Sequence, residues 1–233
     1  MTAIPLALIG IGRMGMALAE LAPAHGFMVV ARISRDQSVT RETLRGAAVA
    51  IEFTVPAAAP GNVRACVAAG CPVVVGTTGW YDALGATADM VREERGTMLA
   101  APNFSVGVAI FDRIVAEAAR LFATVPGFDG HIVETHHTAK KDAPSGTAGL
   151  LARTAETAGG RALPITSVRV GSVPGTHELV YDGAFEQVRL VHEARDRRVF
   201  AQGALVAARW LVGRTGVFTM QDVLSSTATH DHA

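Results

Sequence analysis

The sequence predicts an α/β protein in which a doubly wound parallel sheet is accompanied by a second, smaller α+β domain. Roughly the first hundred residues alternate short, β-rich apolar runs with helical patterns, as in βαβ units. After Asn103, consecutive strand-like runs with short turns such as Asp182-Gly183 replace this alternation, which indicates an antiparallel or mixed sheet. A chain of 233 residues with 49% apolar content is long enough for two modest domains.

Short apolar runs and one-sided apolar stripes place the elements of the first half. The helix that follows the first strand carries Met14, Leu18 and Leu21 along one face, a spacing typical of an amphipathic helix. The helix before the fourth strand is rich in alanine. We expect strands over residues 4–9, 27–33, 48–53, 72–75 and 97–101, and helices over about 13–25 and 57–69.

The second half is predicted to contain two helices packed with four strands, before the chain returns to the first domain. The run 185–193 alternates Val188, Leu190 and His192 with polar neighbours, as a half-buried strand does. Residues 1–104 and 199–233 are therefore assigned to one domain and 105–198 to the other. The expected helices cover about 106–122, 145–158 and 200–211, the strands 129–135, 166–171, 177–182 and 185–193, and the tail 218–224 rejoins the first domain.

Bulk composition argues against nucleic-acid and membrane partners. Twenty-one basic residues balance twenty-one acidic ones, and no apolar run approaches the roughly 20 residues that span a bilayer. Cys66 and Cys71 have no partners at zinc-ligand spacing, so we expect reduced, buried thiols. The start at Met1 lacks the pattern of a signal peptide, which favours a cytoplasmic protein. The tail histidines His230 and His232 are expected to be disordered rather than metal ligands.

A glycine-rich turn at residues 10–15 predicts dinucleotide binding. It reads Gly-Ile-Gly-Arg-Met-Gly, follows the first strand and opens the first helix. The first glycine permits a tight turn, the second lets a pyrophosphate approach the backbone, and the third allows close helix packing. A purely structural turn is the alternative, and the position after an apolar strand favours the nucleotide.

The end of the second strand should select the nicotinamide cofactor. An acid there binds the ribose 2′-hydroxyl of NAD, whereas a basic residue accommodates the 2′-phosphate of NADP. Ser34 and Arg35 suit the phosphate, and Asp36 could serve the hydroxyl. These residues favour NADPH over NADH slightly, with solvated loop residues as the alternative.

The segment from Glu134 to Thr147 concentrates the candidate chemistry of the second domain. It brings two imidazoles and two ammonium groups next to a Pro-Ser-Gly-Thr helix start. Proline is favoured in a first helical turn, serine and threonine cap orphan N–H groups, and glycine lets a ligand approach the main chain. A helix start of this kind suits a carboxylate. The segment therefore predicts a site that protonates one part of a small anion and holds another.

Simpler roles compete for several residues of this segment. Lys141 is expected to be a solvated charge, Asp142 a local partner for the turn into the helix, and Ser145 a cap rather than a nucleophile. His137 alone would more often be structural. A paired-histidine metal site lacks a carboxylate or third imidazole at a recognisable spacing, so no metal is predicted.

Two residues outside the segment are candidate neighbours of a pocket. His177 either borders the pocket or starts a strand in a structural role. Trp80 either walls the nicotinamide pocket or anchors its loop.

Several segments, in order, resemble dihydrodipicolinate reductase, the 4-hydroxy-tetrahydrodipicolinate reductase family of bacterial lysine biosynthesis. They are the opening glycine turn, Gly-Thr-Thr-Gly at residues 76–79, Ala-Pro-Asn-Phe-Ser-Val-Gly-Val at 101–108, the segment 134–148 and Phe-Ala-Gln-Gly-Ala at 200–204. The resemblance covers essentially the whole chain, and His-His-x-x-Lys-x-Asp-Ala-Pro-Ser-Gly-Thr is its most specific part.

The resemblance implies a Rossmann-like dinucleotide domain and a smaller substrate and oligomerisation domain, commonly assembled as a homotetramer through its sheet. It implies reduction of 4-hydroxy-tetrahydrodipicolinate to tetrahydrodipicolinate in diaminopimelate and lysine biosynthesis, with NADPH or NADH. His136 would be the proton donor, assisted by Lys140, and His137, Gly146 and Thr147 would contact the substrate. The implied cofactor contacts are Gly10, Ile11, Gly12, Arg13, Met14, Gly15, Ser34, Arg35, Gly76, Thr77, Thr78, Ala101, Pro102, Asn103 and Phe104.

Two departures from the family pattern and two rival functions stay open. Many members have a glycine turn one residue longer, and many carry an acid where this chain has Ser34, which leaves the cofactor preference open.

One rival function is that of another two-domain reductase of a small amino-dicarboxylate, such as an aspartate dehydrogenase. The other is a dinucleotide-binding sensor without catalysis, against which the intact set of His136, Lys140, Gly146 and Thr147 argues.

Overall fold

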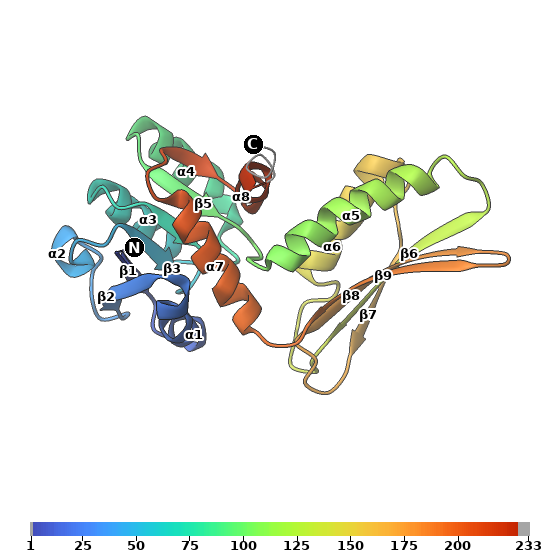
Figure 1. Ribbon diagram of the computed structural model, residues 1–233, viewed down its shortest axis with the longest axis horizontal. Coiled ribbons are helices and arrows are strands. Elements are labelled where there is room, and N and C mark those ends of the chain that lie inside the picture. The colour runs from blue at the N-terminus through green and yellow to red at the C-terminus, as the bar shows by residue number, and fades with distance from the viewer. Residues whose placement is uncertain (1, 228–233) are drawn as a thin grey trace. The chain divides into compact units, whose positions relative to one another are not determined.

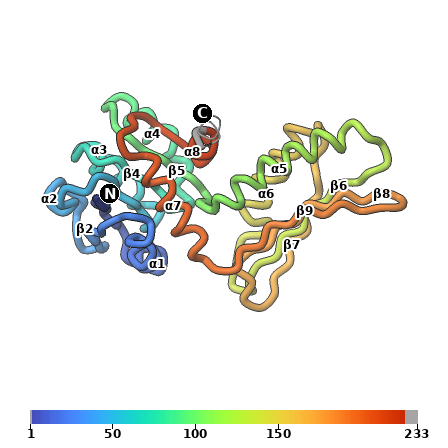
Figure 2. Tube along the Cα trace, viewed as in Figure 1, coloured from blue at the N-terminus to red at the C-terminus, as the bar shows by residue number. Residues whose placement is uncertain are grey.

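The computed structural model describes residues 2–227, and their contacts divide the chain into two compact units (Figures 1 and 2). The first unit takes in the chain up to Ser105 and again from Phe200, and the second unit is Val106–Val199. The sequence-based boundaries fall one residue before these, at 104/105 and 198/199. The tail histidines His230 and His232 lie outside the described residues.

The first unit is built on one parallel sheet of six strands, in the order β10-β5-β4-β3-β1-β2. The predicted doubly wound parallel sheet is confirmed. The four inner strands are short, mostly buried runs rich in Val, Ile, Leu and Ala, as a sheet covered on both faces requires, whereas the two edge strands are partly exposed. The strands are β1 (Ile4–Ile9), β2 (Phe27–Ile33), β3 (Val49–Glu52), β4 (Val73–Val75), β5 (Thr97–Ala100) and β10 (Gly216–Phe218).

Strand order reverses at β1, which pairs with β2 on one side and β3 on the other. In open α/β sheets a ligand binds outside the carboxyl ends of the strands at such a reversal. Gly10 follows β1 and Phe53 follows β3. The glycine turn therefore stands at the position where this architecture binds nucleotides.

Helices cover both faces of the parallel sheet (Figure 1). Alternate strand residues such as Ala7, Ile9 and Val73 share one core cluster with residues of α2, α3 and α4. The other alternate residues, among them Leu6 and Leu8, are also fully buried, and α1 and α7 supply the buried side chains for that face. The helices are α1 (Arg13–Leu21), α2 (Arg41–Leu44), α3 (Ala59–Ala68), α4 (Leu84–Glu93), α7 (Arg198–Leu211) and α8 (Met220–Thr227).

The second unit packs two helices on one face of a four-stranded sheet of order β7-β6-β8-β9. β6 pairs parallel with β7 and antiparallel with β8, and β8 pairs antiparallel with β9. This is the predicted mixed α+β unit. Its elements are α5 (Val106–Phe122), β6 (Phe128–His136), α6 (Gly146–Gly159), β7 (Ile165–Arg169), β8 (Gly175–Gly183) and β9 (Gln187–Ala194).

Several local expectations were wrong. Phe185 does not begin a strand, since it lies fully exposed in the turn and β9 starts at Gln187. The first helix stops at Leu21, and a separate 3₁₀ turn covers Pro23–His25, because proline removes the N–H that would continue the helix. Helices α2 and α4 and strand β10 were not expected: α2 and β10 are short, and α4 begins Leu-Gly without a capping side chain.

The described residues, 2–227, contain no helix that is both long and apolar enough to cross a membrane.

Gly203→Ala is expected to destabilise the first unit. The added methyl group would lie 1.6 Å from the carbonyl oxygen of Phe104, so α7 would have to move away from that loop. Overpacking costs about 1–3 kcal/mol or more, which lowers the unfolding temperature by several degrees. Gly85→Ala in α4 is the control, since its methyl group meets no atom within 4 Å. Calorimetry showing equal unfolding temperatures for the two variants would contradict the prediction.

Candidate active site

The three glycines of the turn after β1 have different surroundings. A Cβ atom at Gly10, whose φ is +93°, would lie 2.0 Å from the carbonyl oxygen of Phe53, and one at Gly15 would lie 2.1 Å from that of Gly10. A Cβ atom at Gly12 would meet nothing within 4 Å. Gly10 and Gly15 are therefore required by packing, whereas Gly12 leaves open space beside the backbone.

The start of α1 offers backbone donors to an anion. Gly12 is the N-cap residue, no side chain caps the helix, and the first turn holds no acidic residue. The first N–H groups of a helix have no partner within the helix, and the helix dipole favours negative charge there. With the open space at Gly12, this turn fits the pyrophosphate of a dinucleotide. Ile11 and Arg13 are exposed, and Met14 is half-buried.

The loop after β4 is held from two sides. The buried Thr77 accepts a hydrogen bond at Oγ1 from the Thr54 N–H (2.7 Å), and its carbonyl oxygen accepts one from the ring N–H of Trp80 (2.8 Å). Trp80 is therefore a buried loop anchor, one of the two roles considered for it. A Cβ atom at Gly76 would overlap the Phe53 ring. Thr78 is exposed at the tip of the loop.

The loop after β5 is fixed against the body of the first unit. Ala101 and Phe104 are buried, Pro102 is exposed, and the Phe104 ring packs edge-on against Phe53 at 6.1 Å. The side-chain oxygen of Asn103 accepts a hydrogen bond from the Ser105 N–H at 2.8 Å. Phe53 thus contacts both loops predicted to bind the cofactor.

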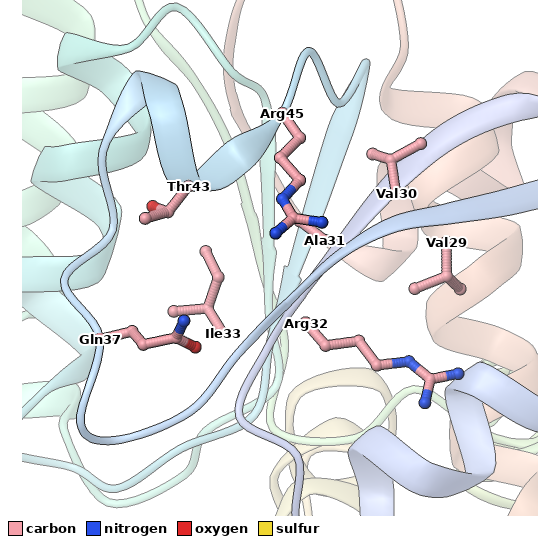
Figure 3. Close-up of a pocket in the computed structure, with 8 residues that line it drawn as sticks. All are labelled: Val29, Val30, Ala31, Arg32, Ile33, Gln37, Thr43 and Arg45. Atoms are coloured by element: carbon pink, nitrogen blue, oxygen red, sulfur yellow. The ribbon is translucent and has the colours of Figure 1, made fainter.

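The residues predicted to select the cofactor lie in the turn after β2. The Oγ of Ser34 is 3.4 Å from Oε1 of Gln37, which also accepts from the Ser34 N–H at 3.1 Å. Arg35 is exposed. A cavity of about 370 Å³ lies along the β2 edge, where Figure 3 shows the Arg32 and Arg45 side chains, but none of the predicted cofactor residues lines it.

In the second unit, the end of β6 holds a buried ion-pair network. Glu134 and His136 are two residues apart on one strand, so their side chains lie on the same face, and the glutamate carboxylate binds Nδ1 of His136. Arg169, at the end of the neighbouring β7, donates to Oε1 of Glu134 at 2.7 Å. The Ser145 N–H donates to the same oxygen at 3.3 Å.

These contacts set the ionisation of both groups. Burial alone would raise the pKa of Glu134, but hydrogen bonds from Arg169, Ser167 and His136 lower that pKa to about 2. Burial lowers the pKa of His136 below its ordinary value, although the Glu134 carboxylate opposes that shift. Glu134 is therefore a carboxylate at neutral pH, with 0% of its side chain exposed.

His177 joins the network from β8. Its Nε2 lies 3.2 Å from the Ser145 hydroxyl, and its ring packs edge-on against His136 at 5.2 Å. Burial lowers the pKa of His177 to about 4, so this ring is neutral near pH 7. His177 lies beside His136 and is the third residue of β8; its part in the site stays a prediction.

Lys140 and His137 have partners of their own. The Lys140 ammonium lies 2.8 Å from the Asp142 carboxylate, and a lone pair of His137 Nε2 accepts from Arg197 at 2.9 Å. Asp142 thus has a local partner within its own loop, as expected, and the cap of the helix is Ser145. Lys141 is exposed, as expected.

The start of α6 matches the prediction for a capped turn. Ser145 is the N-cap residue, and its hydroxyl accepts a hydrogen bond from the Ala148 N–H at 3.2 Å. Gly146 opens the helix, and a Cβ atom there would meet nothing within 4 Å. Thr147 follows in the first turn, half-buried.

A carboxylate and a second imidazole do lie beside His136, contrary to the sequence-based expectation. Glu134, His136 and His177 each offer a potential ligand atom within 4.8 Å of the others. However, Arg169 already occupies one oxygen of Glu134 and His136 the other. A fixed guanidinium beside the carboxylate opposes a second cation, and we assign no metal here.

The sequence assigned no role to Glu134, the first residue of the candidate segment, and gave no signal for Arg169 and Arg197. Glu134 could have been found, because it stands two positions before His136 on a predicted strand. Arg169 could not, since only the register that pairs it with His136 across β6 and β7 brings it there. The predicted substrate residues lie in the second unit and the predicted cofactor residues in the first.

Comparison with known proteins identifies the family. The family model described as dihydrodipicolinate reductase, N-terminus, matches residues 4–104, and the model described as dihydrodipicolinate reductase, C-terminus, matches residues 107–224. The 4-hydroxy-tetrahydrodipicolinate reductase of Christiangramia forsetii is 35% identical over 94% of this chain and 97% of its own length. That of Stenotrophomonas maltophilia strain R551-3 is 39% identical over 91% and 94%.

A solved structure agrees in fold. The dipicolinate-bound dihydrodipicolinate reductase from Paenisporosarcina sp. TG-14 has a TM-score of 0.76 and 20% identity, covering 94% of this chain and 98% of that one. The two family models together span nearly the whole chain. The chain belongs to the dihydrodipicolinate reductase family.

Proposed function

We propose that this protein reduces 4-hydroxy-tetrahydrodipicolinate to tetrahydrodipicolinate, a step of diaminopimelate and lysine biosynthesis, with a nicotinamide dinucleotide as reductant. The observation that carries the proposal is the geometry at the end of β6, where a buried carboxylate holds His136 close to a capped helix start. Family membership supports the same reaction. The site thus combines a proton source with donors for a carboxylate.

His136 is proposed as the proton donor and Lys140 as its assistant. Reduction of a conjugated cyclic dicarboxylate needs a hydride at one carbon and a proton at its neighbour, and imidazole has a pKa suited to the second task. The Lys140 ammonium, held by Asp142, stabilises negative charge that develops during reduction. Because the protonated ring is the donor, turnover should fall as pH rises through the pKa of His136.

Substrate carboxylates are proposed to bind at the start of α6 and beside His137. Gly146 leaves the first turn open, and Thr147 adds a hydroxyl near the same N–H groups. Anions bind well at such a turn because its N–H groups and the helix dipole point at the ligand. His137, fixed by Arg197, serves the other contacts.

The residues proposed to hold the cofactor are the turn 10–15 and the loops at 76–78 and 101–104, with Ser34 and Arg35 at the 2′ position of the ribose. The nicotinamide supplies the hydride when it is bound. The chain's own residues bind and orient the dinucleotide. Ser34 and the exposed Arg35 support a slight preference for NADPH.

The rival functions gain no specific support. The aspartate dehydrogenase of Thermotoga maritima matches at 13% identity with a TM-score of 0.50, a likeness that shows the fold alone.

The free, buried Cys66 and Cys71 suit a reducing cytoplasm. Burial raises the pKa of the Cys71 thiol to about 11, which makes it unreactive.

A homotetramer formed through the second unit's sheet is proposed as the assembly. Within that unit, α5 and α6 pack on one sheet face, and the opposite face presents Val168 and Val191, 37% and 55% exposed. Exposed apolar side chains on an uncovered sheet face are typical of an interface. Four chains of 24.3 kDa would give a particle of about 97 kDa.

His136→Asn and Lys140→Ala are expected to lower kcat by about 10²- to 10⁴-fold, because each removes a group that acts on the reacting atoms. Dinucleotide affinity, measured by fluorescence, should be retained. Lys141→Ala, which changes the adjacent but exposed lysine, is the control and should be near wild type. Near-normal turnover of 4-hydroxy-tetrahydrodipicolinate by the His136 and Lys140 variants would overturn the assigned roles.

Arg35→Ala is expected to raise the KM for NADPH about tenfold and leave that for NADH unchanged, since only NADPH carries the 2′-phosphate. Steady-state kinetics with both cofactors in one preparation measure the difference. Arg41→Ala, another arginine of the same connection, is the control. Equal weakening of both cofactors would count against the phosphate contact.

Val191→Lys is expected to reduce the particle from about 97 kDa to a smaller species, because it places charges inside the proposed interface. Light scattering coupled to size exclusion measures the mass. Val125→Lys, at an apolar side chain of similar exposure (48%) beyond the end of α5, is the control. An unchanged mass for Val191→Lys would argue against assembly through this face.

A further inference from the structure

We propose that Glu134 is a positioning residue that fixes both halves of the substrate site at once, holding the His136 ring with one carboxylate oxygen and the start of α6 with the other. This inference rests on the proposed function and assigns a role that the comparisons do not give. Oε2 binds Nδ1 of His136, and Oε1 accepts from Arg169 and from the Ser145 N–H. One buried carboxylate therefore joins the proton donor to the turn proposed to bind the substrate carboxylate.

The contact at Nδ1 decides which ring nitrogen of His136 exchanges protons. A carboxylate can only accept hydrogen bonds, so Nδ1 keeps its hydrogen whether the ring is neutral or charged. Nε2 is then the atom that gains and loses the proton. A Cβ atom at Gly175 would lie 3.0 Å from that Nε2. A side chain at Gly175 would therefore crowd the exchanging nitrogen.

Several donors together keep Glu134 in the form that this role requires. A carboxylate with 0% of its side chain exposed would be neutral without partners, because burial disfavours charge. The guanidinium of Arg169, 2.7 Å away, offsets part of that burial, and the hydrogen bonds from Ser145, Ser167 and His136 remain when Arg169 is replaced. Arg169 also competes with His136 for the negative charge of Glu134. The balance between the two cations thus sets how strongly the carboxylate stabilises the charged imidazole.

The charged and titratable groups around His136 come from several elements. Glu134 lies on β6, Arg169 on β7 and His177 on β8, with His192 opposite His177 on β9. Lys140 and Asp142 lie in the segment after β6 and pair with each other. Among these, Glu134 alone accepts from the His136 ring. The carboxylate raises the pKa of His136, whereas Lys140 and Arg169 lower it.

Two substitutions are therefore expected to move the titration of His136 in opposite directions. Glu134→Gln removes the stabilising charge, so the pH above which kcat falls should move down, and kcat at pH 7.5 should drop about 10- to 100-fold. Arg169→Met removes the competing cation, so the same midpoint should move up. If Glu134 and Arg169 only supported the fold, the pH dependence of kcat would change in the same direction in Glu134→Gln and in Arg169→Met.

The direct measurement is the ¹⁵N NMR titration of the His136 ring in the full chain, assigned by comparison with His136→Asn. Wild type should keep Nδ1–H in the neutral ring, whereas Glu134→Gln should populate Nε2–H as well, since an amide can also donate to Nδ1. The KM for substrate should rise in Glu134→Gln too, because an amide oxygen is a weaker acceptor for the Ser145 N–H than a carboxylate oxygen. Glu134→Asp, which keeps the charge with a shorter reach, should show smaller changes in the same sense and serves if Glu134→Gln folds poorly.

Glu117→Gln on α5 is the matched control, because it makes the same change to a glutamate that pairs with an arginine (Arg120, 2.6 Å). It should leave the pH profile unchanged. If the His136 titration is unshifted in Glu134→Gln while His136→Asn loses turnover, the positioning role of Glu134 is wrong and the proposed proton donor stands. Normal turnover in His136→Asn would instead overturn the proposed proton donor. Parallel shifts in Glu134→Gln and Arg169→Met would also reject the positioning role.

Discussion

The second unit depends on the burial of one negative charge. Placing the Glu134 carboxylate beneath α6 is costly unless donors surround it. Three elements supply them: β7 contributes Arg169, β6 itself His136, and the start of α6 the Ser145 N–H. The carboxylate is satisfied only when β6, β7 and α6 are all in place. A buried charge of this kind therefore specifies the local arrangement and ties the fold to the proposed chemistry.

In the first unit the corresponding constraint is close backbone approach. Gly10, Gly15 and Gly203 each lie where a Cβ atom would overlap a carbonyl oxygen. These contacts bring the end of β1 against the loop after β3, α1 against Gly10 after β1, and α7 against the loop after β5. Gly12, beside them, has open space instead. The same short segment thus combines positions that packing requires to be glycine with one that leaves room for a ligand.

The sequence predicts features that are carried by local patterns. Apolar runs located β1, β2 and α5 closely, and Pro-Ser-Gly-Thr located the start of α6, because these signals depend only on neighbouring residues. Helix α4 and strand β10 escaped prediction, since one lacks a capping residue and the other has three residues. The packing of Phe53 against two loops was also unpredictable, because it depends on strand order.

The site shows the same division between local and non-local information. His136, Lys140 and Ser145 are close in sequence, so their residue types already indicated a proton donor next to an anion-binding turn. The groups that tune them come from elsewhere: Arg169 arrives by parallel pairing of β6 with β7, and His177 by antiparallel pairing with β8. The local sequence around His136 is thus enough to predict which residue donates the proton. The pKa and the reactive nitrogen of that residue follow from strand register, because register decides which charges share its face of the sheet.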